Sequence, residues 1–131
     1  MGTPAAALLE LGKRYGEGMN ARDFDSVAEL FAADAVYVSD GPPFLTGDRY
    51  GRRLSGRDEI ITYFREVFAG DFEFVVLDHY VGVDMLVTLS SMGGRTFVDV
   101  FRVGEDGLIS ELLDVVPKRS RVDFTQSDSQ V

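Results

Sequence analysis

The second half of the chain constrains the fold most, because it consists of strand-like segments separated only by short turns. Four segments are apolar throughout or alternate apolar with polar residues, and they span residues 72–81, 85–91, 96–103 and 108–116. The breaks at 82–84, 92–94 and 104–107 contain glycine and are short enough to join antiparallel neighbours. The pattern therefore predicts an antiparallel meander that packs one of its faces on helices.

The first of these helices is predicted at the start of the chain, with Thr3 and Pro4 as its cap and first position. Apolar residues then recur on one helical face at Leu8, Leu11, Tyr15 and Met19. Three glycines, at positions 12, 16 and 18, each weaken a helix by up to about 1 kcal/mol relative to alanine. Tertiary contacts must therefore stabilise this helix.

A second, short helix is predicted after Asp23, ending at residues 32–34, with three apolar residues turned inward (Val27, Leu30 and Phe31). A strand should follow over residues 35–40. Its alternation places Tyr37 and Ser39 on one face and Val36, Val38 and Asp40 on the other.

Residues 41–54 have no apolar period and are rich in glycine, proline and polar residues, so we interpret them as a loop that covers a pocket. The sequence at 55–58 resembles a capping box and predicts the start of a third helix, which Gly70 stops. Its core face consists of Ile60, Ile61, Phe64, Val67 and Phe68.

The length of 131 residues suits one domain, which we place at residues 1–117, followed by a polar and flexible tail at 118–131. The formal charge is −9, and the basic residues are scattered, so nucleic acid is not an expected partner. No apolar run reaches the roughly 20 residues of a membrane span, and no basic segment precedes the apolar stretch near the start. We therefore expect a cytoplasmic protein that does not contact membranes.

Cysteine is absent, which excludes disulfides and thiolate chemistry. The single histidine, His79, excludes a multi-histidine metal site within one chain. We therefore predict neither a metal nor a cofactor.

The last hairpin carries the strongest chemical signal, a pair of carboxyl groups. A two-residue turn at Glu105 and Asp106 would pair Asp99 with Leu112 and Phe97 with Asp114, making the two aspartates diagonal neighbours roughly 7–8 Å apart on one face. The same face carries Phe97, Phe101, Leu112 and Val116. Charge is costly among such neighbours, so one carboxyl pKa should rise and leave an acid beside a base.

A structural alternative stays open, in which the two aspartates lie on an exposed or dimer-facing side and only solvate the sheet. Taken singly, the tyrosines at 15, 37 and 63 are typical of core aromatic residues, and His79 is typical of a partly exposed residue near a strand end. The opposite sheet face carries Val98, Val100, Leu113 and Val115, which predicts a homodimer.

Two stretches, residues 23–36 and 54–64, resemble the nuclear-transport-factor-two-like superfamily, and the similarity extends over about residues 5–117. The resemblance implies an α+β, cone-shaped fold, in which three N-terminal helices pack on a curved, mostly antiparallel sheet enclosing a pocket. It also implies an apolar small molecule as the ligand.

Three enzyme groups of that superfamily are similar to different residues of this chain. Ketosteroid isomerases match Tyr15 and Asp99 as their oxyanion-hole pair, whereas Ser39 stands at the position of their catalytic base, with Asp40 next to it. SnoaL-like polyketide cyclases match Asp114 as their acid/base aspartate, although Leu112 and Leu113 replace the usual His-Trp pair.

Limonene-epoxide-hydrolase-like proteins match Asp99 and Asp114, with Tyr37-Val38-Ser39 resembling their water-holding motif and Phe97 in place of their bridging arginine. The hypothesis common to the three groups is cofactor-independent acid/base catalysis (isomerisation, cyclisation or dehydration) on an apolar, cyclic substrate. Asp99, Asp114 and Tyr15 are the predicted catalytic residues. The predicted substrate-binding residues are Tyr37, Ser39, Asp40, Tyr63, His79, Phe97, Phe101, Leu112 and Val116. Epoxide hydrolysis and non-catalytic ligand binding are the alternatives.

Overall fold

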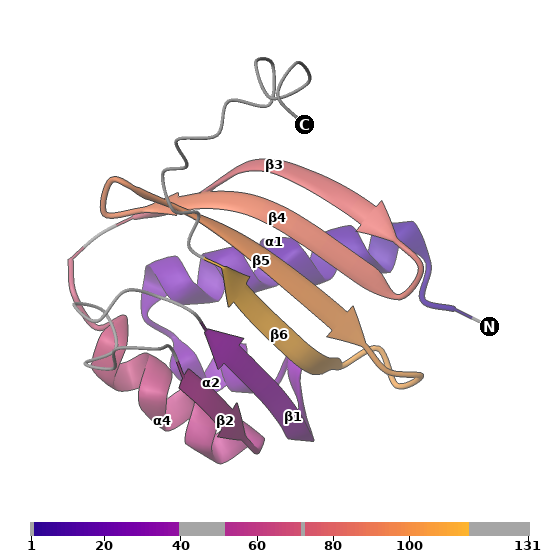
Figure 1. Cartoon of the computed structure of the whole chain (residues 1–131), viewed down its shortest axis with the longest axis horizontal. Coiled ribbons are helices and arrows are strands. Elements are labelled where there is room, and N and C mark those ends of the chain that lie inside the picture. The colour runs from indigo at the N-terminus through magenta and orange to yellow at the C-terminus, as the bar shows by residue number, and fades with distance from the viewer. Residues whose placement is uncertain (1, 40–51, 72, 116–131) are drawn as a thin grey trace, which may run out of the picture.

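The computed structural model describes residues 2–39, 52–71 and 73–115 (Figure 1). Its helices are α1 (Ala5–Ala21), α2 (Phe24–Ala28) and α4 (Arg57–Val67). Its strands are β1 (Phe31–Ser39), β2 (Arg52–Ser55), β3 (Phe74–Gly82), β4 (Met85–Met92), β5 (Arg95–Val103) and β6 (Ile109–Val115). The four predicted strands of the second half are therefore confirmed, with ends that differ by one or two residues.

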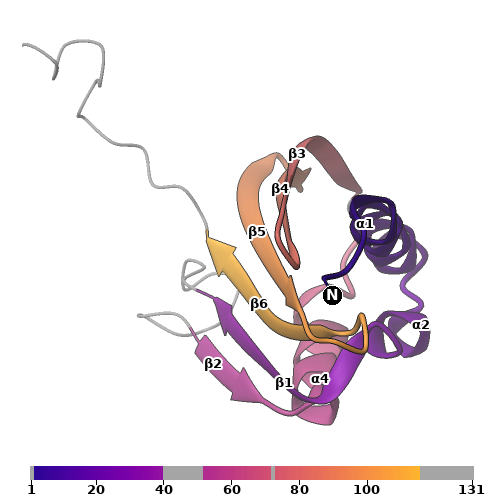
Figure 2. The ribbon, with the colours of Figure 1, turned by 90° about the vertical axis from the view of Figure 1, so that its right-hand side faces the viewer.

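The six strands form one sheet in the order β2-β1-β6-β5-β4-β3. Neighbours are antiparallel except β1 and β6, which run parallel. The sheet curves around the helices, all of which lie on its concave side, with α1 over β3 and β4 and α4 beside β1 and β2 (Figure 2). The predicted α+β fold, with helices packed on a curved and mostly antiparallel sheet, is confirmed.

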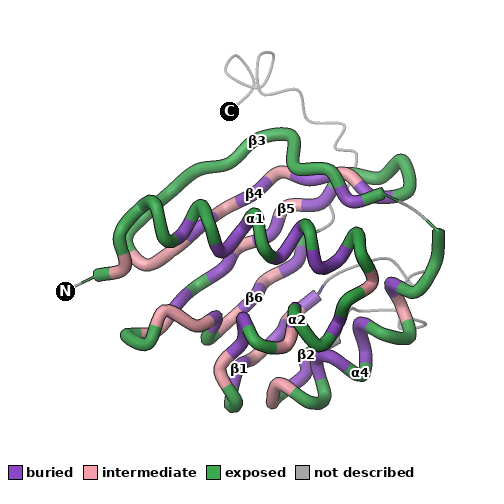
Figure 3. Tube along the Cα trace, turned by 180° about the vertical axis from the view of Figure 1, so that it is seen from behind, coloured by how far each residue is buried: buried purple, intermediate pink, exposed green. Residues whose placement is uncertain are grey.

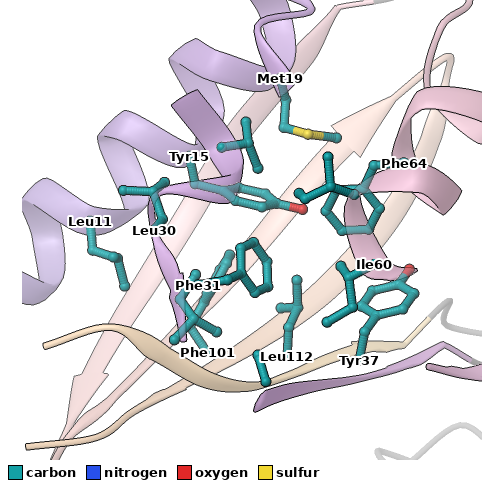
Figure 4. Packing of buried hydrophobic residues seen from close by; sticks show 14 of the residues in the cluster. Leu11, Tyr15, Met19, Leu30, Phe31, Tyr37, Ile60, Phe64, Phe101 and Leu112 are labelled. Carbon is teal, nitrogen blue, oxygen red and sulfur yellow. The ribbon is translucent and has the colours of Figure 1, made fainter. Parts of the chain in front are cut away.

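Helix α1 buries the face that its periodicity predicts, with Leu8, Leu11, Tyr15 and Met19 all at most 7% exposed. Pro4 precedes its first turn, and the helix ends where Arg22 adopts a left-handed backbone conformation with φ 56°. The buried residues of α1, α4 and the sheet (Figure 3) form one apolar cluster, and Figure 4 shows how their side chains pack.

The end of the second helix differs from the prediction. Helix α2 stops at Ala28, and Phe31 already belongs to β1, where it pairs with Ile109 of β6. The backbone carbonyl of Leu30 accepts a hydrogen bond of 2.8 Å from the Ile109 amide. Leu30 and Phe31 are buried, as helical spacing would require, but they are held by strand pairing with a segment far away in the sequence.

The predicted capping box of the third helix is also wrong. Ser55 ends β2, where it pairs with Val36, and Gly56 takes the N-cap position of α4 without a side-chain cap. The proposed covering loop at 41–54 falls mostly on residues 40–51, outside the described residues, whereas Arg52, Arg53 and Leu54 belong to β2. The sheet is thus extended by an edge strand that we did not predict.

Gly16 and Gly18 of α1 differ in how closely a neighbouring side chain approaches them, so alanine substitutions at the two positions make a matched test of packing. A Cβ at position 18 would lie 2.7 Å from Val27 Cγ2, whereas a Cβ at position 16 would meet the Phe74 ring at an ordinary 3.6 Å. Val27 is fully buried, and its β-branched side chain has little rotamer freedom.

We therefore expect Gly18→Ala to lower the free energy of unfolding by about 1 kcal/mol, because overpacking outweighs the gain in helix propensity. Gly16→Ala should raise it by up to about 1 kcal/mol. Urea unfolding followed by circular dichroism measures both changes, and a stabilised Gly18→Ala variant would contradict the close approach of α1 and α2.

Candidate functional site

The hairpin of β5 and β6 places Asp99 directly opposite Asp114. The predicted two-residue turn is wrong, because the strand pairing ends at Val103 and Ile109, which leaves residues 104–108 as the loop, and a register shift follows between Arg102 and Val103. Together these changes move the partner of Asp99 by two residues, from Leu112 to Asp114. A shift of two keeps every side chain on its predicted face, so the two carboxyl groups are closer than the diagonal arrangement we expected.

Both aspartates are buried on the concave face of the sheet. Asp99 is 4% exposed and Asp114 is 6% exposed, and Phe97, Phe101 and Leu112 around them are buried as well. The structural alternative, in which these aspartates only solvate an outer face, is therefore wrong. An isolated buried carboxylate is costly, so this pair requires partners or a proton.

Asp114 receives two hydroxyl groups from β1, which runs beside β6. The hydroxyl of Tyr37 donates to Asp114 Oδ2 at 2.9 Å, and Ser39 Oγ lies 3.5 Å from the same oxygen. This follows from the parallel register, in which Ser39 pairs with Asp114 and Tyr37 with Leu112. Hydrogen bonds donated to a carboxylate favour its ionised form, so Asp114 is the member of the pair that holds the negative charge.

Asp99 has the opposite environment. Its pKa is raised well above the ordinary value of 3.8, first by burial, then by the charge of Asp114, and also by a hydrogen bond with Asp114. These causes favour a neutral Asp99 beside an ionised Asp114. A carboxylic acid and a carboxylate on adjacent strands are the groups that general acid/base chemistry uses.

Tyr15 lies beside this pair. Burial raises the pKa of its phenol well above 10.0, and the neighbouring carboxyl groups of Asp99 and Asp114 raise it further. The pKa of Tyr37 is also raised, by burial and by Asp114. Both phenols consequently stay protonated and can act as hydrogen-bond donors.

Tyr15, Asp99 and Asp114 line a common cavity of about 10 Å³, which is near the size needed for one water molecule. The deep pocket that we expected around the two aspartates is not open among the described residues. A larger hollow of about 470 Å³ lies between α1 and the strands β3 and β4. Phe74 lines both spaces.

The other predicted binding residues fall in three places. Phe97 lines the small cavity, the ring of Phe101 packs edge-on against Tyr15 at 4.9 Å between centroids, and Leu112 is fully buried beneath them. Tyr63 packs against Tyr37, with ring centroids 5.7 Å apart.

His79 is not at the carboxyl pair, because it lies exposed on the edge strand β3 and lines the larger hollow. Asp40 and Val116 lie outside the described residues.

Several residues of the site were not predicted. The small cavity is also lined by Met19, Phe68, Phe74 and Met92. Two buried hydroxyl side chains, Thr88 and Ser90, lie on the same concave face, and Thr88 is opposite Asp99 in the pairing of β4 with β5. The sequence could have indicated these two residues, because side chains alternate along residues 85–91 and Thr88 and Ser90 lie on the same face as the apolar Leu86.

Comparison with known proteins gives a consistent result. A family model described as a SnoaL-like domain matches residues 13–112. A SnoaL-like protein from Burkholderia thailandensis has 22% identity and a TM-score of 0.78, over 90% of this chain and 100% of that one. A protein from Kribbella flavida with the provisional name ketosteroid isomerase has 22% identity and a TM-score of 0.63, over 87% and 80%.

A computationally designed binder of 17-OHP has the same fold, with 18% identity and a TM-score of 0.66, over 82% of this chain and 88% of the designed one. No curated protein matches the sequence. Within the part of the chain that the structure describes, none of the helices has the length and apolar character of a membrane span.

Proposed function

The chain belongs to the family of SnoaL-like domains, and from this premise we propose that it is an acid/base enzyme acting on an apolar, cyclic small molecule through an enol or enolate. The reaction classes that fit are isomerisation, cyclisation and dehydration. The support comes from the site rather than from the fold, because one fold hosts many functions.

The single observation that carries the proposal is the asymmetry of the carboxyl pair. Asp99 and Asp114 face each other in a buried site, but only Asp114 receives the hydroxyl groups of Tyr37 and Ser39. Two like groups with different hydrogen-bond partners take different protonation states, and the pair acquires separate roles as acid and base.

In the proposed mechanism Asp114 accepts a proton from a carbon atom next to the substrate carbonyl. The electron pair of the broken C–H bond moves to the carbonyl oxygen, and the neutral Asp99 and the Tyr15 hydroxyl donate hydrogen bonds to that developing enolate oxygen. Asp114 then returns the proton to another carbon atom of the substrate. No atoms are gained or lost in an isomerisation by this route.

Epoxide hydrolysis is a second candidate, favoured by the cavity beside the pair. Its volume of about 10 Å³ suits one water molecule within reach of both aspartates. In this reaction Asp114 takes a proton from that water, the resulting hydroxide attacks an epoxide carbon, and Asp99 protonates the leaving oxygen. The described residues place the apolar Phe97 rather than a cation next to the pair, which makes this the weaker candidate.

The experiment that tests the acid/base assignment follows exchange of the hydrogens next to the carbonyl of α-tetralone in deuterium oxide. This exchange reports enolate formation without assuming the natural product of the enzyme. Asparagine variants of the two aspartates, compared for exchange and for binding of the same ketone, separate catalysis from ligand binding.

The second sheet face supports a further proposal, that two copies of the chain associate through it. Val98, Val100 and Leu113 lie half-buried on the convex face, opposite the helices, and Val115 is 39% exposed there. On the same face of β3, Tyr80 is 62% exposed. An apolar face of this kind is typical of an isologous interface between identical subunits.

We therefore expect a dimer in sedimentation velocity at micromolar concentration. Val100→Asp should give a folded monomer, because it places a charge at the centre of this face. Val83→Asp is the matched control, since Val83 is 87% exposed in the turn between β3 and β4 and should leave the dimer intact. A monomeric wild-type chain would refute the proposal.

A further inference from the structure

The large hollow between α1 and the strands β3 and β4 is a groove with a mostly apolar wall. Its volume is about 470 Å³, within the range of sites that bind small organic molecules. On the helix side Gly12 and Gly16 lie one turn apart and leave room for the neighbouring strands. On the sheet side Phe74, Val76 and Leu86 form the apolar part of the wall, beside Thr88 and His79. A neutral apolar molecule suits such a surface better than a charged one.

One buried polar group lies in this apolar wall. Thr88 is only 3% exposed and lines the groove, and its Oγ1 accepts a hydrogen bond of 3.4 Å from Ser90 Oγ. Because Thr88 accepts in this contact, its own hydroxyl proton is not donated to Ser90 and is available for another acceptor. An oxygen atom of a ligand in the groove is an acceptor of the required kind.

Thr88 also connects the groove with the carboxyl pair. It is the cross-strand partner of Asp99, and such neighbours on one face lie roughly 5 Å apart. Phe74 forms the wall that the groove and the small cavity share, and its ring packs edge-on against Tyr15 at 5.8 Å. A ligand oxygen at Thr88 is therefore next to the acid of the site.

The position of Phe74 is held by α1. The side-chain amide of Asn20 donates to the Phe74 carbonyl at 2.8 Å, and its oxygen accepts from the Phe74 amide at 2.6 Å. These two hydrogen bonds satisfy both backbone polar groups of Phe74, as a neighbouring strand would, and hold the start of β3 against the end of α1. Asn20 therefore fixes the position of Phe74, which closes one end of the groove.

We propose that the groove between α1 and β3–β4 binds the neutral, apolar body of the substrate, with an oxygen atom of that body accepting a hydrogen bond from Thr88. This inference rests on the proposed function for the identity of the ligand as substrate. The groove itself is tested separately, with a probe that undergoes no reaction.

The probe is Prodan, a neutral naphthalene ketone whose fluorescence depends on polarity and hydrogen bonding, titrated with the full chain. Val76→Phe places a ring in the groove from a position that is 41% exposed, and it should weaken binding by about tenfold or more. Val75→Phe is the matched control, because the adjacent residue of β3 points to the opposite face and is similarly exposed at 38%. This control should bind Prodan within about twofold of the wild type.

Thr88→Val removes the hydroxyl and keeps the shape. We expect roughly two- to tenfold weaker Prodan binding, with emission of the bound probe shifted to shorter wavelength because the hydrogen bond to its carbonyl is lost. Unchanged binding by Val76→Phe, or equal losses in Val76→Phe and Val75→Phe, would overturn the groove as the site. Unchanged emission in Thr88→Val would overturn the role of Thr88.

The α-tetralone assay distinguishes this inference from the proposed function. If the groove holds the substrate body, Val76→Phe raises KM for exchange and leaves kcat unchanged. If the groove variants weaken Prodan binding but Asp114→Asn keeps full exchange, the groove is a binding site and the proposed acid/base function is wrong. If Asp114→Asn loses exchange while Val76→Phe keeps the wild-type KM and kcat, the acid/base function is supported and the groove does not bind the substrate.

Discussion

Asp114→Asn is expected to reduce the α-tetralone exchange rate by about 10²- to 10⁴-fold, the usual contribution of a general base. Asparagine has nearly the same shape and can still accept the hydrogen bond from Tyr37, but it cannot accept a proton from carbon. Binding of the ketone should therefore stay within about twofold of the wild type. Exchange is followed by proton NMR and binding by a separate fluorescence competition with Prodan.

A matched control for this variant lies on the same strand. Glu111 of β6 forms a partly exposed ion pair with Arg102 at 3.2 Å and is outside the cavity, so Glu111→Gln should retain full exchange. Thermal unfolding of both variants checks that they fold. Exchange by Asp114→Asn at the wild-type rate would remove the acid/base assignment and leave the domain as a ligand-binding module.

Asp99→Asn should make the protein more stable at neutral pH, by an amount that grows with pH. The pKa of folded Asp99 is raised above 3.8, so the folded state keeps this proton while the unfolded chain loses it. The contribution of Asp99 to the stability of the wild type therefore falls as pH rises from 3.8 to its folded pKa, by about 1.4 kcal/mol for each pH unit. The amide of asparagine cannot ionise, so the free energy of unfolding of the variant does not fall with pH for this reason.

The measurement is the difference in unfolding free energy between variant and wild type, obtained by urea unfolding at several pH values. Below pH 3.8 the two proteins should have similar stabilities, and above it the variant should gain steadily. Other carboxyl groups with lowered pKa, such as Asp23 and Asp78, lose their stabilisation as pH falls, but they contribute equally to both proteins and cancel.

Asp34→Asn, the same substitution at an exposed position of β1, serves as the control for changing an aspartate to asparagine. A difference between Asp99→Asn and the wild type that is independent of pH would show that Asp99 ionises normally. The proposed neutral acid would then be lost, even if Asp114 proved essential for exchange.

Side-chain parity explains why the aspartate pair could be predicted although its register could not. Residues two apart in a strand share a face whatever their partners are, so Asp99 stays on the face of Phe97 and Asp114 on the face of Leu112. The longer loop and the irregularity between Arg102 and Val103 together shift the register by two residues, so the two aspartates remain on one face. Their direct opposition depended on the shift between Arg102 and Val103, and no residue pattern marks that irregularity. The prediction that both aspartates share one sheet face was correct, and the predicted distance between them was wrong.

The partners of Asp114 illustrate a different limit. Tyr37 and Ser39 were correctly placed on one face of a strand, and they were assigned to substrate binding. Their contact with Asp114 requires β1 to lie parallel to β6, which is 70 or more residues later in the chain. Local alternation contains no information about such a neighbour, so the role of these hydroxyl groups in stabilising an ionised Asp114 emerged only from the folded sheet.

The amino-acid sequence by itself determined the strand and helix periods, the face on which each side chain lies, and hence the burial of two aspartates among apolar residues. These properties are local, because they follow from backbone geometry that repeats every two or 3.6 residues. The tertiary structure alone decided that Asp99 and Asp114 stand opposite each other, that Tyr37 and Ser39 hold the charged member, and that His79 lies on an edge strand away from the pair. These properties depend on strand order, loop length and register, which are set by the packing of distant segments rather than by any one of them.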